Sequence, residues 1–290
     1  MRQPRQSLPL ISAEPMQVLV RRAGAVESSH TIDVAICDAQ GSVLVGLGDV
    51  EHQIFPRSAM KPLQAIALAE KSIHLSEQKK LTTTEYSLIC ASHNGQRIHV
   101  DAARHLLKKF DLSPDLLVCG AHWSSDQPTA ISQIRSLEVP TKILNNCSGK
   151  HAGMLVLASL LGAAPDGYAA LSHPVQQSIL GTLETMTGID LMQFPHGVDG
   201  CGAPALSGPL GNWARGFALL GILLMNILGF GMASGGVSWI CSEEVEACSI
   251  TADDSFSFSL STFIPAFSRR IRPSSSIVSS VTHSRPSRCD

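Results

Sequence analysis

The segment of residues 55–62 constrains the fold most strongly, because it ends in Lys61 followed by Pro62. Proline is tolerated in an α-helix only in the first turn, where its missing N–H would have no partner anyway. A helix is therefore expected to begin here. Residues three apart lie on one helix face, so the amine of Lys61 is expected to reach the hydroxyl of Ser58. A lysine whose pKa is lowered by burial can take a serine proton, which makes the pair a candidate nucleophile and base.

A simpler explanation of the same pair is a serine that caps the helix, followed by a lysine on the surface. A serine and a lysine at this spacing also occur by chance in many chains of this length. In addition, Lys61 precedes a proline, a position that disfavours helical backbone angles. Both explanations of Ser58 and Lys61 therefore stay open on these residues alone.

The residues before this segment predict β-structure. Residues 18–20 have the composition of a strand, and residues 21–30 are expected to form a polar connection. Residues 31–37 and 42–46 surround a turn at residues 38–41, and the first of these segments alternates apolar and polar side chains. An antiparallel hairpin is therefore expected.

The residues after this segment predict mainly helices. Thr82 and Glu85 have the spacing of a capping box, in which each side chain bonds the other residue's backbone N–H at a helix start. Residues 143–144 are expected to form a short strand, and residues 196–204 an irregular loop. Helices are expected over residues 63–69, 86–89, 98–110, 128–137, 149–155 and 174–186.

Composition places the chain among globular proteins. Apolar residues make up 44% and charged residues 16% of the 290 positions, which allows a substantial core. A net charge of −2 does not provide the basic surface of a nucleic-acid-binding protein. The eight cysteines form no tight pairs, and the first twenty residues contain no apolar run long enough for a secretory signal. A cytoplasmic protein with reduced cysteines is therefore expected.

Four motifs together resemble those of the Rhizobium-type L-asparaginases, a family often called asparaginase II. The motifs are Ser58-Ala59-Met60-Lys61-Pro62, Ala91-Ser92-His93-Asn94-Gly95, Asn145-Asn146-Cys147-Ser148-Gly149-Lys150-His151 and Asp199-Gly200-Cys201-Gly202. The likeness extends from about Val18 to about Phe217, and its third motif is the most specific. It implies hydrolysis of L-asparagine to L-aspartate and ammonia. The implied fold is α/β (α+β), similar to the serine β-lactamases, with an antiparallel sheet packed with helices.

The resemblance also implies a role for each matching residue. The catalytic residues would be Ser58 as nucleophile, Lys61 as its partner, and Ser92 in the same hydroxyl network. The substrate-binding residues would be Arg57, His93, Asn94 and Asp199. The zinc ligands would be Cys147, Lys150 and Cys201. The expected partners are L-asparagine and, in a homodimer, a second copy of the chain; no nucleic acid and no membrane are expected.

Elementary chemistry agrees with these roles but leaves alternatives open. Ser92 and Asn94 have the Ser-x-Asn spacing that accompanies Ser-x-x-Lys in β-lactamases, where we expect the second serine to relay a proton. Two thiolates and a deprotonated lysine amine can supply three zinc ligands. On the residue pattern alone, buried inert cysteines are favoured at Cys147 and Cys201, and His93 and His151 can each be an ordinary core histidine.

The likeness divides the chain into four segments. Residues 1–16 are an N-terminal extension, 17–217 the asparaginase-like catalytic domain, 218–233 an apolar segment, and 234–290 a divergent serine-rich tail that is disordered in part. The apolar segment is shorter than the roughly 20 residues that span a membrane. A buried helix is therefore expected, with a membrane anchor as the alternative.

The C-terminal part departs from the family pattern. The family supplies a further lysine from a C-terminal strand, whereas no lysine follows Lys150 here. A second cation would help keep Lys61 neutral, so its loss should weaken the base. The C-terminal part of the fold is therefore expected to be incomplete. The alternatives to an active asparaginase are a truncated or divergent member with impaired or no activity, and a broader β-lactamase-like or glutaminase-like serine hydrolase.

Overall fold

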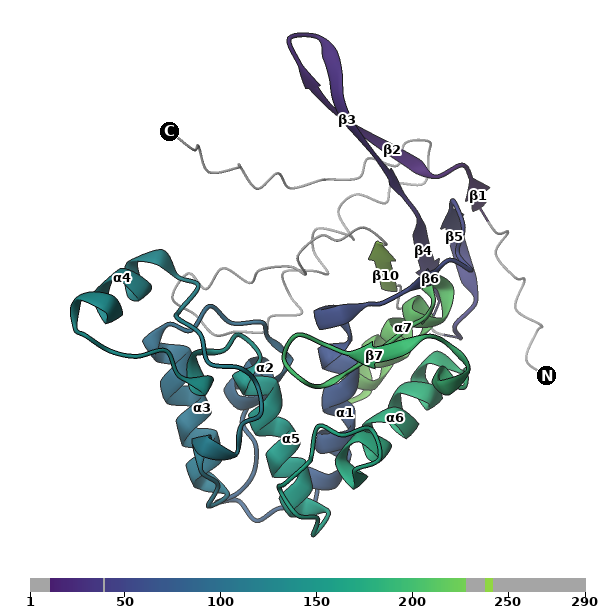
Figure 1. Ribbon diagram of the computed structural model, residues 1–290. Coiled ribbons are helices and arrows are strands. Elements are labelled where there is room, and N and C mark those ends of the chain that lie inside the picture. The colour runs from purple at the N-terminus through teal and green to yellow at the C-terminus, as the bar shows by residue number, and fades with distance from the viewer. Residues whose placement is uncertain (1–10, 39, 228–237, 242–290) are drawn as a thin grey trace, which may run out of the picture. The chain divides into compact units, whose positions relative to one another are not determined.

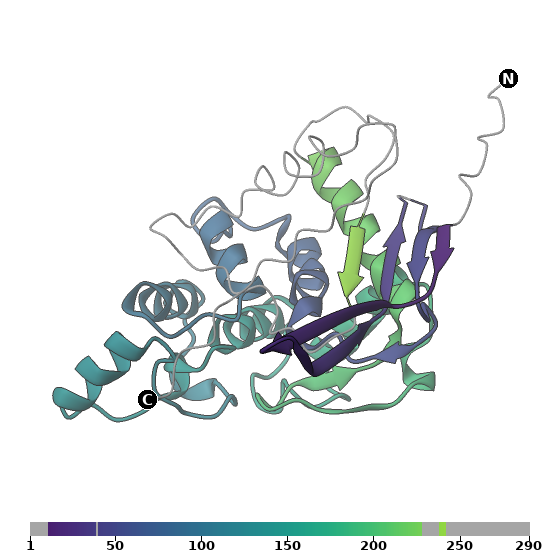
Figure 2. The ribbon, with the colours of Figure 1, turned by 90° about the horizontal axis from the view of Figure 1, so that it is seen from above.

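A four-stranded sheet joins N-terminal strands to a C-terminal one in the computed structural model, which describes residues 11–38, 40–227 and 238–241. Its strands, in spatial order, are β1 (Ile11–Ala13), β5 (Val43–Leu47), β4 (Val34–Cys37) and β10 (Ser238–Cys241) (Figures 1 and 2). β4 and β5 run antiparallel, which confirms the predicted hairpin. The expected antiparallel pairing holds for β4 with β5 and with β10, but β1 is parallel to β5, so the sheet is mixed. β10 pairs antiparallel with β4, so a C-terminal strand covers that edge.

A separate ribbon, β2 (Met16–Arg22) and β3 (Ala25–Ile32), forms a long antiparallel hairpin (Figure 1). The prediction of a polar connection over residues 21–30 was therefore wrong. Ala23 and Gly24 form the two-residue turn, with φ angles of 48° and 84°, and a turn of this kind suits the twist of paired strands. Seven of the eight residues of β3 are exposed, so the strand has no buried face and no apolar alternation to reveal it.

The helix α5 (Ser148–Leu160) is the most buried helix of the described chain, because every residue from 148 to 158 is buried. It contacts α1 (Lys61–Ser72), α2 (Thr83–Cys90), α3 (Arg97–Lys109) and α6 (Pro174–Thr187) (Figure 1). Small residues allow this close packing. A Cβ atom at Gly149 would lie 2.4 Å from the backbone oxygen of Leu88 in α2, so only glycine fits.

Shorter elements complete the described chain. They are β6 (Gln53–Ile54) paired with β9 (Gly208–Pro209), β7 (His196–Val198) paired with β8 (Pro204–Leu206), α4 (Gln127–Arg135), and the 3₁₀ turns η1 (Arg57–Met60), η2 (Pro114–Leu116), η3 (Lys142–Leu144) and η4 (Leu191–Gln193). The strand predicted at residues 143–144 was wrong, because both residues are buried in η3 and a two-residue apolar run does not distinguish the two states. The loop predicted at residues 196–204 contains β7 and ends at the first residue of β8, the strand with which β7 pairs.

The capping box predicted from Thr82 and Glu85 is present at the start of α2. Thr82 caps α2: its hydroxyl accepts the backbone N–H of Glu85 at 3.2 Å, and the Glu85 carboxylate accepts the N–H of Thr82 at 2.7 Å. The same carboxylate forms a buried ion pair with Lys109 of α3 at 2.9 Å. One glutamate therefore both starts α2 and joins it to α3.

The helix α7 (Leu210–Ile227) runs through the point where the composition of the chain changes. It packs against α6 and against the strands β4 and β10. The buried helix expected over residues 218–233 corresponds in part to α7, although Leu223 is exposed; residues 228–233 and the tail after Ile271 lie outside the described residues. None of the helices in the described part of the chain combines the length and apolar character of a membrane span.

Candidate active site

Ser58 lies in η1, the turn that joins β6 to α1, and not within α1 itself. α1 begins at Lys61, and Pro62 occupies its first turn as predicted. Lys61 adopts helical angles (φ −55°, ψ −41°) in spite of the proline that follows it. Arg57 has a φ of 49°, a left-handed conformation that costs a non-glycine residue about 1–3 kcal/mol. Such strain persists only where the surrounding structure imposes it, and it is concentrated at functional sites.

The amine of Lys61 is buried beside the C-terminal end of α2. The residue is 2% exposed, and its Nζ donates to the backbone oxygen of Ala91 and to Oγ of Ser92, each at 2.7 Å. Ser92 is exposed and Ser58 is half-buried. Within the described chain no hydrogen bond joins Lys61 to the hydroxyl of Ser58. The structure therefore pairs this lysine with Ser92, which follows α2, and not with the serine three residues before it.

Burial has the largest effect on the Lys61 amine and lowers its pKa. The sulfur of Cys147 opposes this shift, whereas the positive charge of Lys150 adds to it. A lower pKa increases the fraction of neutral amine near pH 7. Lys61 is therefore better able to accept a proton than a lysine on the surface.

The two cysteines that the sequence separates by 54 positions lie together. Cys147 is at the start of α5, Lys150 is in the first turn of that helix, and Cys201 lies between β7 and β8. Nζ of Lys150 donates to Sγ of Cys201 at 3.1 Å. The hydrogen bond between the two thiols raises the pKa of Cys147 and lowers that of Cys201. The cluster therefore favours a thiol at Cys147 and a thiolate at Cys201, with Nζ of Lys150 beside the thiolate.

The Cys147–Lys150–Cys201 cluster contains two sulfur atoms and one amine nitrogen, which can bind zinc only in their deprotonated forms. Thiolate sulfur and neutral nitrogen are the ligands that zinc prefers, and a catalytic zinc site keeps three protein ligands and one open position. In the described part of the chain, no group of three histidine, cysteine, aspartate or glutamate side chains is arranged for a metal. A zinc ion at this site would therefore need the Lys150 amine as its third protein ligand.

Arg57 and Asp199, both expected to bind substrate, form an ion pair of 2.8 Å. Arg57 is largely exposed, whereas the Asp199 side chain is 13% exposed. Asp199 is held by a tight turn, in which its N–H donates to the oxygen of Ala203 and its oxygen accepts the N–H of Gly202. The turn that carries Cys201 therefore also connects the cluster to the strained residue before Ser58.

His93 lies in the core, and both of its ring nitrogens have partners. The N–H of Gly95 donates to Nδ1 at 3.2 Å, so the imidazole proton is on Nε2 and is donated to Oγ of Ser148 at 2.9 Å. The Ser148 hydroxyl in turn donates to the oxygen of Ile143. Burial lowers the pKa of His93 to about 3, so the ring is neutral. These contacts are those of a core histidine, one of the two roles that the sequence left open.

Asn94 contributes its backbone to the fold. Its backbone oxygen accepts hydrogen bonds from the hydroxyl of Ser124 at 2.6 Å and from the N–H groups of Ser125 and Asp126. Its side-chain oxygen is buried and has no hydrogen-bond partner among the described residues. No hydrogen bond in that part of the chain joins Asn94 to Lys61.

Three further polar residues lie near the cluster: Gln64 and Tyr168, which were not predicted as site residues, and His151, which the sequence indicated only as part of the third motif. Gln64, one turn after Lys61, is 6% exposed, and its signal was a polar side chain on the apolar face of α1. His151 is fully buried, and its Nδ1 lies 2.7 Å from the hydroxyl of Tyr168, which also accepts the N–H of Val118. Nε2 of His151 has no hydrogen-bond partner among the described residues, and the Cys201 side chain opposes the lowering of the His151 pKa by burial. No sequence signal connected Tyr168 to the site.

Comparison with known proteins agrees with the resemblance found in the sequence. The family model described as L-asparaginase II matches residues 18–223, which is more than two thirds of the chain. No curated protein matches the chain. The matched region contains every residue of the site described above, from Arg57 to Cys201. The chain therefore belongs to the L-asparaginase II family.

Proposed function

We propose that this chain hydrolyses L-asparagine to L-aspartate and ammonia, with Ser58 as its nucleophile. Membership of the L-asparaginase II family indicates an amidohydrolase that acts on a small molecule. The observation that carries the proposal is the buried amine of Lys61, which has a lowered pKa and lies 2.7 Å from the hydroxyl of Ser92. A buried lysine bonded to a serine hydroxyl is an arrangement that can move protons.

In the proposed reaction, Ser92 connects Lys61 to the nucleophile. Oγ of Ser58 attacks the side-chain amide carbon of asparagine, and its proton passes through the Ser92 hydroxyl to the Lys61 amine. The C–N bond then breaks, and the proton returns from Lys61 to the leaving nitrogen, which departs as ammonia. Water hydrolyses the resulting ester by the same route, which releases aspartate and restores Ser58.

Arg57 and Asp199 provide opposite charges at the same site, 2.8 Å apart. L-Asparagine carries an α-carboxylate and an α-ammonium group. In the proposed complex the guanidinium of Arg57 binds the carboxylate, and Asp199 binds the ammonium group. The substrate would thereby be oriented by two ion pairs, and the strained backbone of Arg57 places one of them next to Ser58.

The Cys147–Lys150–Cys201 cluster is proposed to bind zinc. A bound zinc ion would supply a positive charge that polarises a carbonyl group or a water molecule. The chain's own contribution is to bring the three donor atoms together from α5 and the loop between β7 and β8. The buried position of Lys150 and Cys201 also limits the access of water to the cluster.

The proposal also covers the fold type, the location and the oligomeric state of the protein. The mixed α/β fold is proposed to be of the serine β-lactamase type, with residues 17–217 as the catalytic domain. A cytoplasmic location and a homodimer are proposed as well. The proposed reaction does not depend on any of these features.

The test is ammonia release from L-asparagine by the purified chain, with bound zinc measured in the same sample. Ser58→Ala is expected to lower kcat by roughly a thousandfold or more, because it removes the nucleophile. Ser132→Ala, at an exposed serine in α4, is the matched control and should keep the wild-type rate. Equal rates for Ser58→Ala and the control would contradict the role of Ser58.

A second candidate is a family member that binds zinc or a small ligand without turnover. It is favoured by the absence of any lysine after Lys150 and by the bond of Lys61 to Ser92 without a bond to Ser58. Soluble, zinc-loaded protein that releases no ammonia would support this candidate. Activity on L-glutamine or a β-lactam comparable to that on L-asparagine would instead indicate a broader serine hydrolase.

A further inference from the structure

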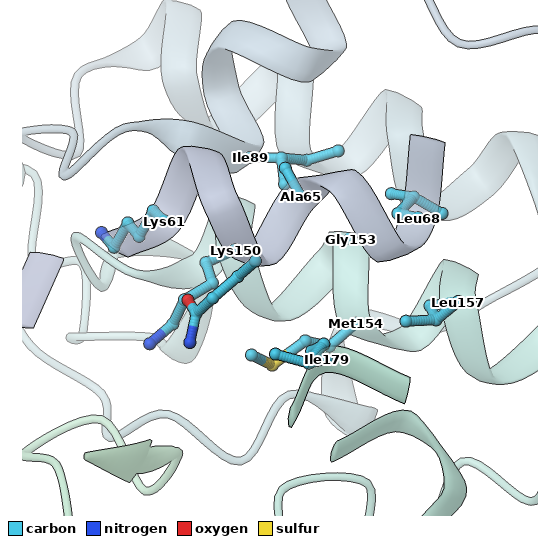
Figure 3. Close-up of a pocket in the computed structure, with 10 residues that line it drawn as sticks. Lys61, Ala65, Leu68, Ile89, Lys150, Gly153, Met154, Leu157 and Ile179 are labelled. Carbon is cyan, nitrogen blue, oxygen red and sulfur yellow. The ribbon is translucent and has the colours of Figure 1, made fainter. Parts of the chain in front are cut away.

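A small cavity lies between α1, α5 and α6, next to the candidate site. Its volume is about 20 Å³, and Lys61, Gln64, Lys150, Leu68, Leu157 and Ile179 are among its lining residues. Figure 3 shows Lys61 and Lys150 at one end of the cavity and the apolar side chains of Leu68 and Leu157 at the other. A cavity needs at least about 10–15 Å³ and two or more polar partners to hold a water molecule. The cavity as a whole meets the size requirement for one water, and its polar partners lie at the end with Lys61, Gln64 and Lys150.

Gln64 supplies a hydrogen-bond acceptor at this cavity. The residue is 94% buried, and Oε1 has no partner among the described protein atoms. Leaving a buried acceptor without a partner is unfavourable, so such atoms in proteins are usually bonded to ordered water. Gln176 of α6 differs: it is also buried, but its side-chain amide is held by the protein, since Nε2 donates to the backbone oxygen of Tyr168 at 2.9 Å.

Lys150 supplies the donors. An ammonium group has three N–H donors and a neutral amine has two. Nζ of Lys150 bonds Sγ of Cys201 at 3.1 Å and makes no other hydrogen bond to a described residue. The neighbouring Lys61 differs, because its Nζ bonds both Ala91 and Ser92. At least one N–H of Lys150 is therefore available to a group in the cavity.

We propose that one water molecule in this cavity links Oε1 of Gln64 to Nζ of Lys150, and that Gln64 thereby positions the Lys150 amine against Cys201. Outer hydrogen-bond partners of this kind orient the groups that contact a metal or a substrate. Gln64 is a positioning residue in this scheme, since it acts through Lys150. The inference deepens the proposed function and rests on the role proposed there for the Cys147–Lys150–Cys201 cluster.

The test begins with crystal structures of the full chain and of Gln64→Leu, which removes both polar atoms at similar volume. The wild-type structure is expected to show an ordered water within hydrogen-bond distance of Oε1 and Nζ. In Gln64→Leu the water should be absent, and Nζ of Lys150 should leave its contact with Cys201. A dry wild-type cavity, or an unmoved Lys150 in the variant, would overturn the proposal.

The second readout is zinc affinity, measured with Zn²⁺ in competition with a chromophoric chelator. Gln64→Leu is expected to weaken binding by roughly ten- to hundredfold, with no loss of thermal stability, because no satisfied hydrogen bond to a protein atom is removed. Gln176→Leu makes the same chemical change at a satisfied glutamine, so it should lower the melting temperature and keep the affinity of the folded protein. Equal zinc affinity in wild type and Gln64→Leu would overturn the positioning role.

Two further results, a variant that does not fold and a wild-type chain that binds no zinc, can be told apart. Should Gln64→Leu fail to fold, Gln64→Met provides an unbranched apolar side chain with the same expected effects. Should the wild-type chain bind no zinc, the proposed metal role fails, but the water and the position of Lys150 in the two crystal structures still decide the inference.

Discussion

The contact between α2 and α5 is buried and closely packed, whereas the hairpin of β2 and β3 is largely exposed. Along α5, Gly149 touches the backbone of α2, and eleven consecutive residues are buried. Along β3, seven of eight residues are exposed, and Val26 at its start is 49% exposed. Several residues of the candidate site lie in α5 or directly after α2, whereas none lies in the hairpin. Positions beside the site are therefore expected to tolerate far less change than positions in the ribbon.

The largest effect is expected at the closest contact between α2 and α5. Gly149→Ala would place a Cβ atom 2.4 Å from the backbone oxygen of Leu88, so the two helices must separate. The free energy of unfolding should fall by about 3 kcal/mol or more, measured by urea denaturation. Gly181→Ala in α6 is the control, because no atom lies within 4 Å of its Cβ; it should stabilise the helix by about 1 kcal/mol. A similar change in both variants would show that the contact is not tight.

A smaller effect is expected from pH, through His93. The ordinary pKa of 6.5 applies to the unfolded chain, and burial lowers the folded value to about 3. Above pH 6.5 the ring is neutral in both states, and the full stability is present. As pH falls towards 3, the unfolded chain takes up a proton that the folded chain does not, so the contribution is lost, by about 2 kcal/mol at pH 5.

The measurement is the free energy of unfolding at pH 7 and at pH 5 for wild type and His93→Gln. The variant should lose about 2 kcal/mol less than the wild type between the two pH values. His105→Gln, at an exposed histidine of α3, serves as the control and should keep the wild-type difference. A pH dependence in His93→Gln as steep as in the wild type would mean that His93 is not the responsible group.

The smallest effect is expected in the hairpin. Val26→Thr should change the free energy of unfolding by less than about 0.5 kcal/mol, because the side chain is half exposed and threonine suits a strand. The same substitution at Val156, which is fully buried in α5, should cost about 1–3 kcal/mol, since it buries a hydroxyl group. Thermal unfolding of the two variants tests the contrast, and equal losses would remove the distinction between the two regions.

The elements that the sequence predicted well have local causes. Thr82 and Glu85 are three positions apart and complete their capping box without help from the rest of the chain. Pro62 marks the first turn of α1 in the same way. The strand β3 was missed for the opposite reason, since an exposed strand depends on its pairing partner and has no apolar pattern.

The candidate site was predictable as a set of residues but not as a set of contacts. The motifs contained Lys61 and Ser92, yet their bond depends on α1 and α2 packing against each other and against α5. The helical spacing favoured Ser58 as the partner of Lys61, but Ser58 lies in the turn before the helix. The partners of the His93 ring, Gly95 and Ser148, were likewise not predictable from the motif.

The sequence by itself determined the family, the mixed α/β class, the helix starts and the residue types of the site, because each depends on local order or on motifs along the chain. Only the tertiary structure decided that Cys201 lies beside Lys150, that Lys61 bonds Ser92, and that Gln64 faces a water-sized cavity. These contacts join residues far apart in the sequence or depend on how helices pack. Their energies come from burial and close packing, which no local pattern records.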